Sequence, residues 1–253
     1  MNQTEFAALA AEGYNRIPVV REVLADTETP LSTYLKLGRG THSYFFESVQ
    51  GGEKWGRFSI IGLPCRTVIK VQGNSVTVET DSQIVEQIDC EDPFRFVNEY
   101  KDRFKVAPSP AVQRFAGGLV GYFSYDTVRF VETSIGESKG SDEIGTPDIL
   151  LMLSEEVVVF DNLRGTISLV IHVDPAQDDA YNKAQSRLDE LAAELNKPTQ
   201  FPVAADEGAV SADYRLHFAQ EDYQAAVQRI KEYIVAGDDA GGVGPAHVGG
   251  FCR

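Results

Sequence analysis

The sequence predicts an α+β protein in which antiparallel strands are flanked by helices. Runs rich in β-branched and aromatic residues lie between Gly and Asn breakers, which is typical of antiparallel strands. Other segments repeat apolar residues at helical spacing. The chain has 253 residues, 43% of them hydrophobic, which is enough for a sizeable core. This composition excludes the fibrous, disordered and membrane-spanning classes.

Two short helices are predicted ahead of the first strand. Thr4 can cap the first helix, and Gly13 can end it in left-handed geometry. Thr29 can cap the second, with Pro30 at its first helical position and Gly38 at its close.

Four strand-like runs follow from Ser43 and predict an antiparallel meander. Interrupted by Gly-Gly and Gly-Asn turns, they are SYFFESV, RFSIIG, RTVIKVQ and SVTVETD. A third helix is expected to begin at Asp92 and to bury Phe94, Val97 and Tyr100.

A Gly-rich strand and a long hairpin are predicted next. The run FAGGLVGYFSYD leads into a short helix near Tyr125. We interpret Gly117, Gly118 and Gly121 as points of close backbone approach, because their order fits no phosphate-binding pattern. Downstream, DILLMLSEEVVVF and TISLVIHV predict a hairpin long enough for the middle of a large sheet. We interpret Glu155, within the first of these two runs, as solvated surface.

Composition divides the chain into four parts. They are an amino-terminal domain, a linker rich in Pro, Gly and charge, the start of a second domain and a Gly-rich tail, at residues 1–196, 197–213, 214–238 and 239–253. An amphipathic helix closes the first part. Another helix, in the third part, places Tyr223, Val227 and Ile234 on one face.

Charge and cysteine content narrow the classes of function. The chain has 23 Lys and Arg residues against 38 Asp and Glu residues, so we expect neither nucleic acid nor a membrane surface as a partner. Cys65, Cys90 and Cys252 are too scattered for a disulfide scaffold or a zinc site. The amino terminus lacks a secretory pattern. We therefore expect a cytoplasmic protein that binds small molecules or other proteins.

One group of polar residues has the chemistry of a ligand site. Glu47 and Ser48 are predicted to end a strand, and Arg57 to open the next one after a Gly-Gly turn. A carboxylate, a hydroxyl and a guanidinium would then meet at one end of a hairpin. Such a set can recognise a zwitterion, because the guanidinium binds a carboxylate and the Glu binds an ammonium group. The alternative is an ordinary capped hairpin with a surface Arg.

The same residues carry a resemblance to a known family. The blocks SYFFESVQGGEKWGRFSIIGLPCRTV, FAGGLVGYFSYDTVRFVE, PDILLMLSEEVVVFDN and EDYQAAVQRIKEYIVAGD resemble, in this order, the amino-terminal half of anthranilate synthase component I. The resemblance ends at Asp238. It implies a two-sheet core flanked by helices, in which strands from both halves of the family enzyme pair.

The resemblance implies a chorismate-using enzyme of tryptophan biosynthesis. Family members make anthranilate and pyruvate from chorismate, with Mg²⁺ and with ammonia from a glutamine amidotransferase subunit, and tryptophan inhibits them by feedback. Their inhibitor site uses a Leu-Leu-Glu-Ser motif, which here is Phe45, Phe46, Glu47 and Ser48. By this resemblance we expect Ser48, Arg57 and Glu47 to bind L-tryptophan.

Catalysis is not expected of this chain alone. In the family, the chorismate pocket, the Mg²⁺ ligands and the catalytic His lie in the carboxyl-terminal half, which has no counterpart here. We therefore assign no catalytic residue and no metal ligand. Read one nucleotide later, the codons from Asp239 onward can encode Met-Gln-Val-Val, which resembles the family's continuation. We expect a frameshift near Asp239 to have produced an out-of-frame tail.

Two alternatives remain. One is a tryptophan-binding regulatory module without catalysis, and the other is the related aminodeoxychorismate synthase component I. In each case the lone chain is expected to leave sheet edges and apolar surface uncovered, and therefore to self-associate or dissolve poorly.

Overall fold

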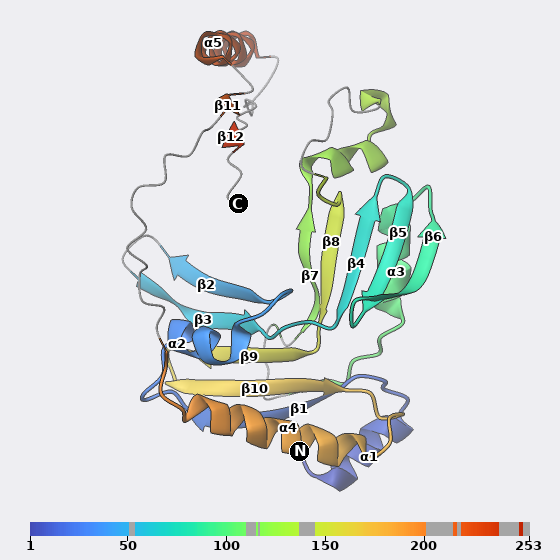
Figure 1. The fold of residues 1–253 in the computed structure, drawn as a ribbon, viewed down its shortest axis with the longest axis vertical. Helices are drawn as coiled ribbons and strands as arrows, with labels where there is room; N and C mark the ends of the chain where they lie inside the picture. The colour runs from blue at the N-terminus through green and yellow to red at the C-terminus, as the bar shows by residue number, and fades with distance from the viewer. Residues whose placement is uncertain are drawn as a thin grey trace. The chain divides into compact units, whose positions relative to one another are not determined.

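The structure is a computed structural model that describes most of the chain (Figure 1). The described residues are 1–50, 54–109, 115, 117–136, 145–200, 215–216, 219–237 and 248–249. For Ser48 the backbone alone is described. The chain divides into two compact units, Met1–Phe201 and Pro202–Arg253.

Two five-stranded antiparallel sheets make up the first unit, which confirms the predicted α+β class with a two-sheet core. The first sheet consists, in spatial order, of β1 (Ile17–Leu24), β10 (Thr166–Val173), β9 (Glu156–Asp161), β3 (Lys54–Gly62) and β2 (Tyr44–Gln50). The second consists of β6 (Gln83–Asp89), β5 (Ser75–Thr80), β4 (Thr67–Gln72), β8 (Ile149–Ser154) and β7 (Gly118–Phe123).

Helices cover one face of the first sheet (Figure 1). The helices described in this unit are α1 (Gln3–Ala11), α2 (Pro30–Thr33), the π-helix η1 (Tyr34–Gly38), α3 (Pro93–Asp102), the 3₁₀ helices η2 (Tyr125–Phe130) and η3 (Thr133–Ile135), and α4 (Ala180–Leu195). The apolar stripe of α4 buries Leu188 and Leu191 in the same core as Ile61, Phe160 and Leu169 of the sheet.

The helix α3 covers one face of the second sheet. It buries Phe96 and Tyr100 in a core that includes Ile69 of β4. Phe94 and Val97, which the sequence pattern predicts to be buried, are half-buried. Tyr100 is thus buried as predicted, whereas Phe94 packs against aromatic side chains of β7 and η2.

The chain crosses between the sheets at two places where the sequence suggests continuity. β3 and β4 lie in different sheets, so the prediction of one four-strand meander is wrong. The four strands form two separate hairpins, β2–β3 and β4–β5. The run predicted as one long strand is likewise two strands, β8 and β9, broken at Glu155. Pro64 lies at the first crossing, where it has no N–H to donate to a ladder. Both halves of each run are apolar, so hydrophobic pattern alone cannot reveal the break.

Glu155, at the second break, is half-buried, which corrects its interpretation as solvated surface. Its Oε1 accepts a hydrogen bond from Nε of Arg16 at 3.1 Å. Arg16 also pairs with Asp174 at 3.3 Å. Burial raises the pKa of Glu155, and Arg16 acts in the opposite direction. The bend between the sheets is therefore tied to the start of β1 by an ion pair.

Two strands of the first unit, β1 and β6, were missed in the sequence, and both are sheet edges. β1 contains Pro18, a residue that argues against a central strand but is tolerated at an edge. β6 is exposed along most of its length, so it has no buried face to produce an alternating pattern.

The helix caps agree with the sequence in part. Thr29 caps α2 as predicted, and its side chain accepts a hydrogen bond from Ser32 N at 3.0 Å. The helix α1, by contrast, is capped by Asn2 and not by Thr4. Asn2 and Glu5 each accept a hydrogen bond from the other's backbone N at 2.9 Å. This reciprocal arrangement satisfies two amides at once.

The Gly-rich strand β7 is confirmed as a place of close backbone approach. A Cβ atom on Gly121 would lie 1.8 Å from the carbonyl oxygen of Leu150, and one on Gly117 would lie 2.5 Å from that of Ser154. Gly118 differs, since a Cβ there would meet nothing within 4 Å, and its φ of +127° is what favours glycine.

The second unit contains α5 (Gln220–Ala236) and the short paired strands β11 (Arg215–Leu216) and β12 (Val248–Gly249). The helix ends at Gly237, whose φ is +82°. No residue of α5 is buried, so the predicted apolar face stays uncovered within the described residues. Residues 201–213 of the predicted linker lie outside the described residues. Most of the predicted tail also lies outside them.

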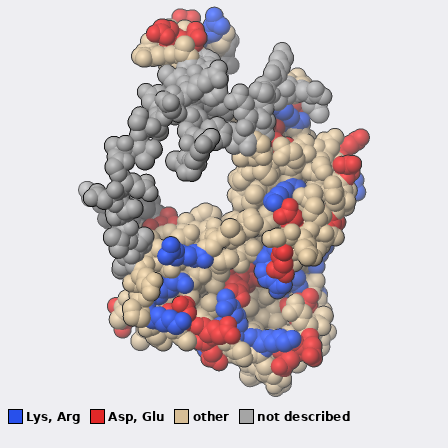
Figure 2. Space-filling view, in the orientation of Figure 1, with Lys and Arg blue, Asp and Glu red and all other residues tan. Residues whose placement is uncertain are grey.

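Charged side chains of both signs are interspersed on the face shown in Figure 2. Among the described residues, many charged side chains are paired, as in Arg187–Glu156 at 3.0 Å and Arg103–Glu86 at 2.8 Å. Within the described part of the chain, no helix combines the length and the hydropathy that a membrane span needs.

Candidate functional site

The predicted polar group lies on the β2–β3 hairpin, at an edge of the first sheet. Glu47 pairs with Ser59 in a regular ladder, whereas Val49 pairs with Trp55. Ser48 alone therefore stands opposite the three residues of β3 that lie between Trp55 and Ser59. Such a register break leaves backbone groups without ladder partners and bends the strand locally.

Arg57 is the middle residue of these three, and its guanidinium is bonded to Asp161 at the end of β9. Its Nε lies 3.2 Å from both carboxylate oxygens, and its Nη2 donates to Oδ2 at 2.8 Å. The hydrogen bond and charge of Arg57 hold the pKa of Asp161 below its ordinary value of 3.8. The Arg57 side chain is 45% exposed and that of Asp161 is 12% exposed. The guanidinium is thus both held in place and accessible from solvent.

The turn after β9 holds the backbone of the same segment. Asn162 N donates to the carbonyl oxygen of Arg57 at 2.8 Å. Asn162 Nδ2 donates to the carbonyl oxygen of Gly56 at 3.0 Å and lies 3.4 Å from Ser59 Oγ. Two backbone amides of the turn donate to the Asp161 carboxylate at 3.1 and 3.2 Å. The part of β3 that has lost its regular pairing with β2 is therefore bonded to this turn.

The structure brings the predicted residues together along the backbone. Ser48 does not end its strand, since β2 continues for two residues beyond it, and Arg57 lies inside β3. Glu47 is exposed, and none of the described residues donates a hydrogen bond to its carboxylate. Asp161 and Asn162 were missed as site residues. The available signal was an Asp-Asn pair at the end of an apolar run, which indicates only a turn.

A buried polar contact lies at the regular end of the same hairpin. The hydroxyl of Tyr44 and Ser154 Oγ are 2.8 Å apart, which joins β2 to β8 of the other sheet. Burial raises the pKa of Tyr44 to about 12 and that of Cys65 to about 11. Both groups therefore stay protonated near neutral pH, which suits a structural role better than a nucleophilic one.

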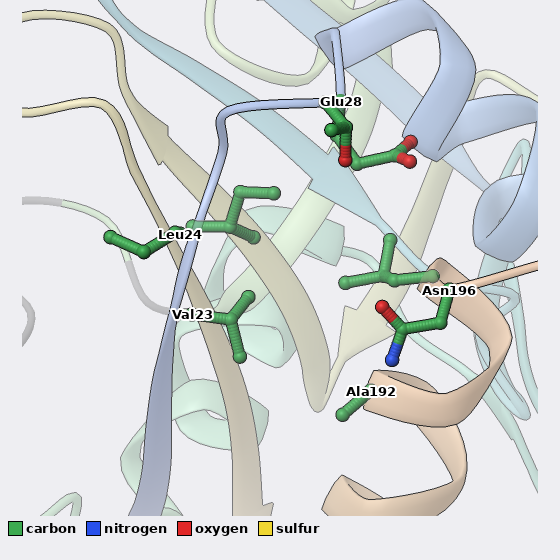
Figure 3. Close-up of a pocket in the computed structure, with 8 residues that line it drawn as sticks. Val23, Leu24, Glu28, Ala192 and Asn196 are labelled. Carbon is green, nitrogen blue, oxygen red and sulfur yellow. The ribbon is translucent and has the colours of Figure 1, made fainter.

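A small cavity lies between β1, α4 and the chain entering α2 (Figure 3). Its lining residues are Val23, Leu24, Thr27, Glu28, Ile167, Ala192, Leu195 and Asn196. The Glu28 carboxylate accepts hydrogen bonds from Ser32 Oγ at 2.7 Å and from Lys36 Nζ at 2.5 Å. The volume is about 90 Å³, whereas ligand pockets measure about 300–1,000 Å³. With its carboxylate already paired, this cavity is a poor candidate for a ligand site.

The described side chains also bear on whether a metal ion could bind. Among them, no three or more His, Cys, Asp or Glu side chains gather closely enough to hold a metal ion. The residues present therefore do not fit the Mg²⁺ that the resemblance implies, and we assign no metal chemistry to them.

Comparison with known proteins bears on the same hairpin. The family model described as chorismate binding enzyme matches residues 42–240, a range that includes β2, β3 and the turn after β9. The chain belongs to the chorismate-binding enzyme family. This confirms the family resemblance that the sequence blocks indicate.

Two relatives refine this placement within the chorismate-binding family. Anthranilate synthase component 1 of Pseudomonas aeruginosa is 52% identical over 242 residues, and that of Pseudomonas putida is 53% identical over 241 residues. Each alignment covers 94% of this chain and 49% of the relative. The chain thus spans about half the length of the curated relatives it matches. These names do not favour the aminodeoxychorismate alternative.

The fold agrees with a solved structure. A crystal structure of anthranilate synthase component I from Streptococcus pneumoniae TIGR4 matches with a TM-score of 0.52 and 24% sequence identity. The match covers 85% of this chain and 46% of that chain. It supports the architecture of two antiparallel sheets with flanking helices.

Proposed function

We propose that this chain is part of an anthranilate synthase component I. The proposed reaction converts chorismate and ammonia to anthranilate and pyruvate, the first step of tryptophan biosynthesis, and a partner amidotransferase subunit supplies the ammonia from glutamine. The observation that carries the proposal is the identity of 52% and 53% to two proteins of that name over 94% of the chain. Catalytic residues and Mg²⁺ ligands are not assigned to the described residues.

The proposal includes a regulatory site for L-tryptophan on the β2–β3 hairpin, with Ser48, Arg57 and Glu47 as its ligands. The accessible guanidinium of Arg57, next to the register break that contains Ser48, supports it. A guanidinium forms strong charge-assisted hydrogen bonds with a carboxylate. The exposed Glu47 carboxylate is available to an ammonium group.

A hybrid enzyme tests the reaction. Residues 1–237 of this chain are joined to the corresponding remainder of the Pseudomonas aeruginosa relative, and anthranilate formation from chorismate and ammonia is followed by fluorescence. We expect anthranilate from the hybrid and none from the 253-residue chain alone. A folded hybrid that makes aminodeoxychorismate, or that makes no product, would contradict the proposed reaction.

Titration calorimetry with L-tryptophan tests the regulatory site. We expect binding by the 253-residue chain, loss of binding in Arg57→Ala, and unchanged binding in Arg66→Ala. The last variant is a matched control, because Arg66 is also exposed and also pairs with an Asp, at 2.5 Å. Tryptophan binding combined with an inactive hybrid would favour the second candidate, a regulatory module without catalysis.

A further inference from the structure

Both the main chain and the side chain of Arg57 are held by one turn that the ligand motif does not include. Asn162 donates hydrogen bonds to the carbonyl oxygens of Gly56 and Arg57, and the Asp161 carboxylate accepts hydrogen bonds from the guanidinium. These contacts act on the segment of β3 that faces Ser48 across the register break. This segment of β3 is therefore held from the side of β9, through both its backbone and the Arg57 side chain.

We infer that Asp161 and Asn162 are positioning residues of the amino-acid site, an inference that rests on the proposed function. Asn162 fixes the backbone of β3 opposite Ser48. Asp161 fixes the guanidinium of Arg57 so that it selects ligands carrying a carboxylate.

The hydrogen-bond donors of the Arg57 guanidinium support this role. A guanidinium has five N–H donors. Asp161 engages Nε and Nη2, whereas Nη1 donates to none of the described residues. The free donors on Nη1 and Nη2 share one edge of the guanidinium, and such an edge binds a carboxylate in a bidentate manner. A ligand carboxylate can thus bind while the contact with Asp161 persists.

The arrangement is also fixed before a ligand arrives. Asp161 is itself held by two backbone amides of its own turn and is largely buried. A long Arg side chain normally loses conformational freedom when it binds, and a side chain already fixed by the fold loses less. Removing the Asp161 carboxylate should therefore weaken recognition of the ligand carboxylate without removing Arg57.

A second pair provides a control of the same chemistry. Arg66 and Asp81 also form a two-point ion pair, at 2.8 and 2.5 Å, and Asp81 N also donates to the carbonyl oxygen of Arg66. This pair is associated with β4 and β5 of the other sheet, whose mutual register is regular. Asp81→Asn thus removes a similar charge and similar hydrogen bonds away from the proposed site.

The experiment compares Asp161→Asn and Asp81→Asn in the 253-residue chain, using calorimetry with L-tryptophan and with L-tryptophanamide, which lacks the carboxylate. We expect Asp161→Asn to weaken tryptophan binding about tenfold, the scale of a lost hydrogen bond to a charged group, and to leave amide binding unchanged. Asp81→Asn should bind both ligands as the unmodified chain does.

The outcomes separate the inference from the function on which it rests. An equal loss for both ligands, or no loss in Asp161→Asn, would overturn the positioning role and leave the proposed site standing. Failure of the unmodified chain to bind tryptophan would overturn the site and the inference together. If Asp161→Asn does not fold, Asp161→Glu replaces it, because it keeps the charge and shifts the guanidinium. An unchanged preference for tryptophan over its amide in that variant would overturn the inference.

Discussion

The two ends of the β2–β3 hairpin are held by different interactions. At the end formed by Tyr44 and Gly62 the ladder is regular, and the Tyr44 ring lies across Gly62. The Tyr44 hydroxyl forms a hydrogen bond with Ser154 of the other sheet. At the end near Ser48 and Arg57 the β2–β3 register breaks, and the turn after β9 donates a hydrogen bond to the Arg57 carbonyl oxygen. The comparison indicates that the regular end contributes stability through packing. The irregular end leaves the Arg57 guanidinium exposed.

Two consecutive residues of β9 show the same division. Phe160 is 2% exposed and belongs to the core beneath α4. Asp161 follows it and bonds the exposed guanidinium of Arg57. Because successive side chains of a strand point to opposite faces, Phe160 packs in the core and Asp161 contacts Arg57 of the candidate site.

The largest effect is expected at the packed position. Phe160→Ala should lower the free energy of unfolding by about 3–5 kcal/mol, because it opens a cavity in a filled core. Urea unfolding followed by circular dichroism measures this change. The control is Phe46→Ala on β2, where the side chain is 52% exposed and the cost should be on the order of 1 kcal/mol. Equal costs at the two positions would contradict the distinction between core and surface positions in this sheet.

An intermediate effect is expected from overpacking the regular end. A Cβ atom on Gly62 would lie 1.9 Å from Cε1 of Tyr44, so Gly62→Ala must displace a buried ring. The expected cost is about 1–3 kcal/mol. A double-mutant cycle sharpens the assignment, because Gly62→Ala should cost little more once Tyr44→Ala has removed the ring. Full additivity of the two substitutions would show that the clash with Tyr44 is not the cause.

The smallest effect is expected at the irregular end, as a change in acid sensitivity. Arg57 lowers the pKa of Asp161 from 3.8 in the folded state. The carboxylate therefore contributes stability above pH 3.8, and this contribution is lost as the pH falls through the lower folded pKa. The contribution is small because the Arg57 side chain is exposed and the pair is screened by solvent.

Urea unfolding at neutral and at acid pH measures this contribution. Asp161→Asn should be less stable than the unmodified chain at neutral pH and should lose less stability on acidification. Asp81→Asn should behave in the same direction, because Arg66 lowers the pKa of Asp81 as well. Parallel acid profiles for the unmodified chain and Asp161→Asn would show that the ion pair contributes no stability.

Features that depend on neighbouring residues could be predicted from the amino-acid sequence alone. The α+β class, the cap at Thr29 and the close approach at Gly121 follow from local pattern and from the conformational preferences of single residues. The ordered blocks also identified the family, since they preserve residue types along the chain. The hairpin that carries Ser48 and Arg57 was located in the same way.

The assignment of strands to sheets and the contacts that hold the candidate site depend on pairing between distant segments. Apolar runs that cross from one sheet to the other at Pro64 and Glu155 look continuous, because both of their halves are buried. Arg57 and Asp161 are 104 residues apart. Their contact arises from strand pairing between β3 and β9, and pairing between distant segments leaves no periodic signal in either one.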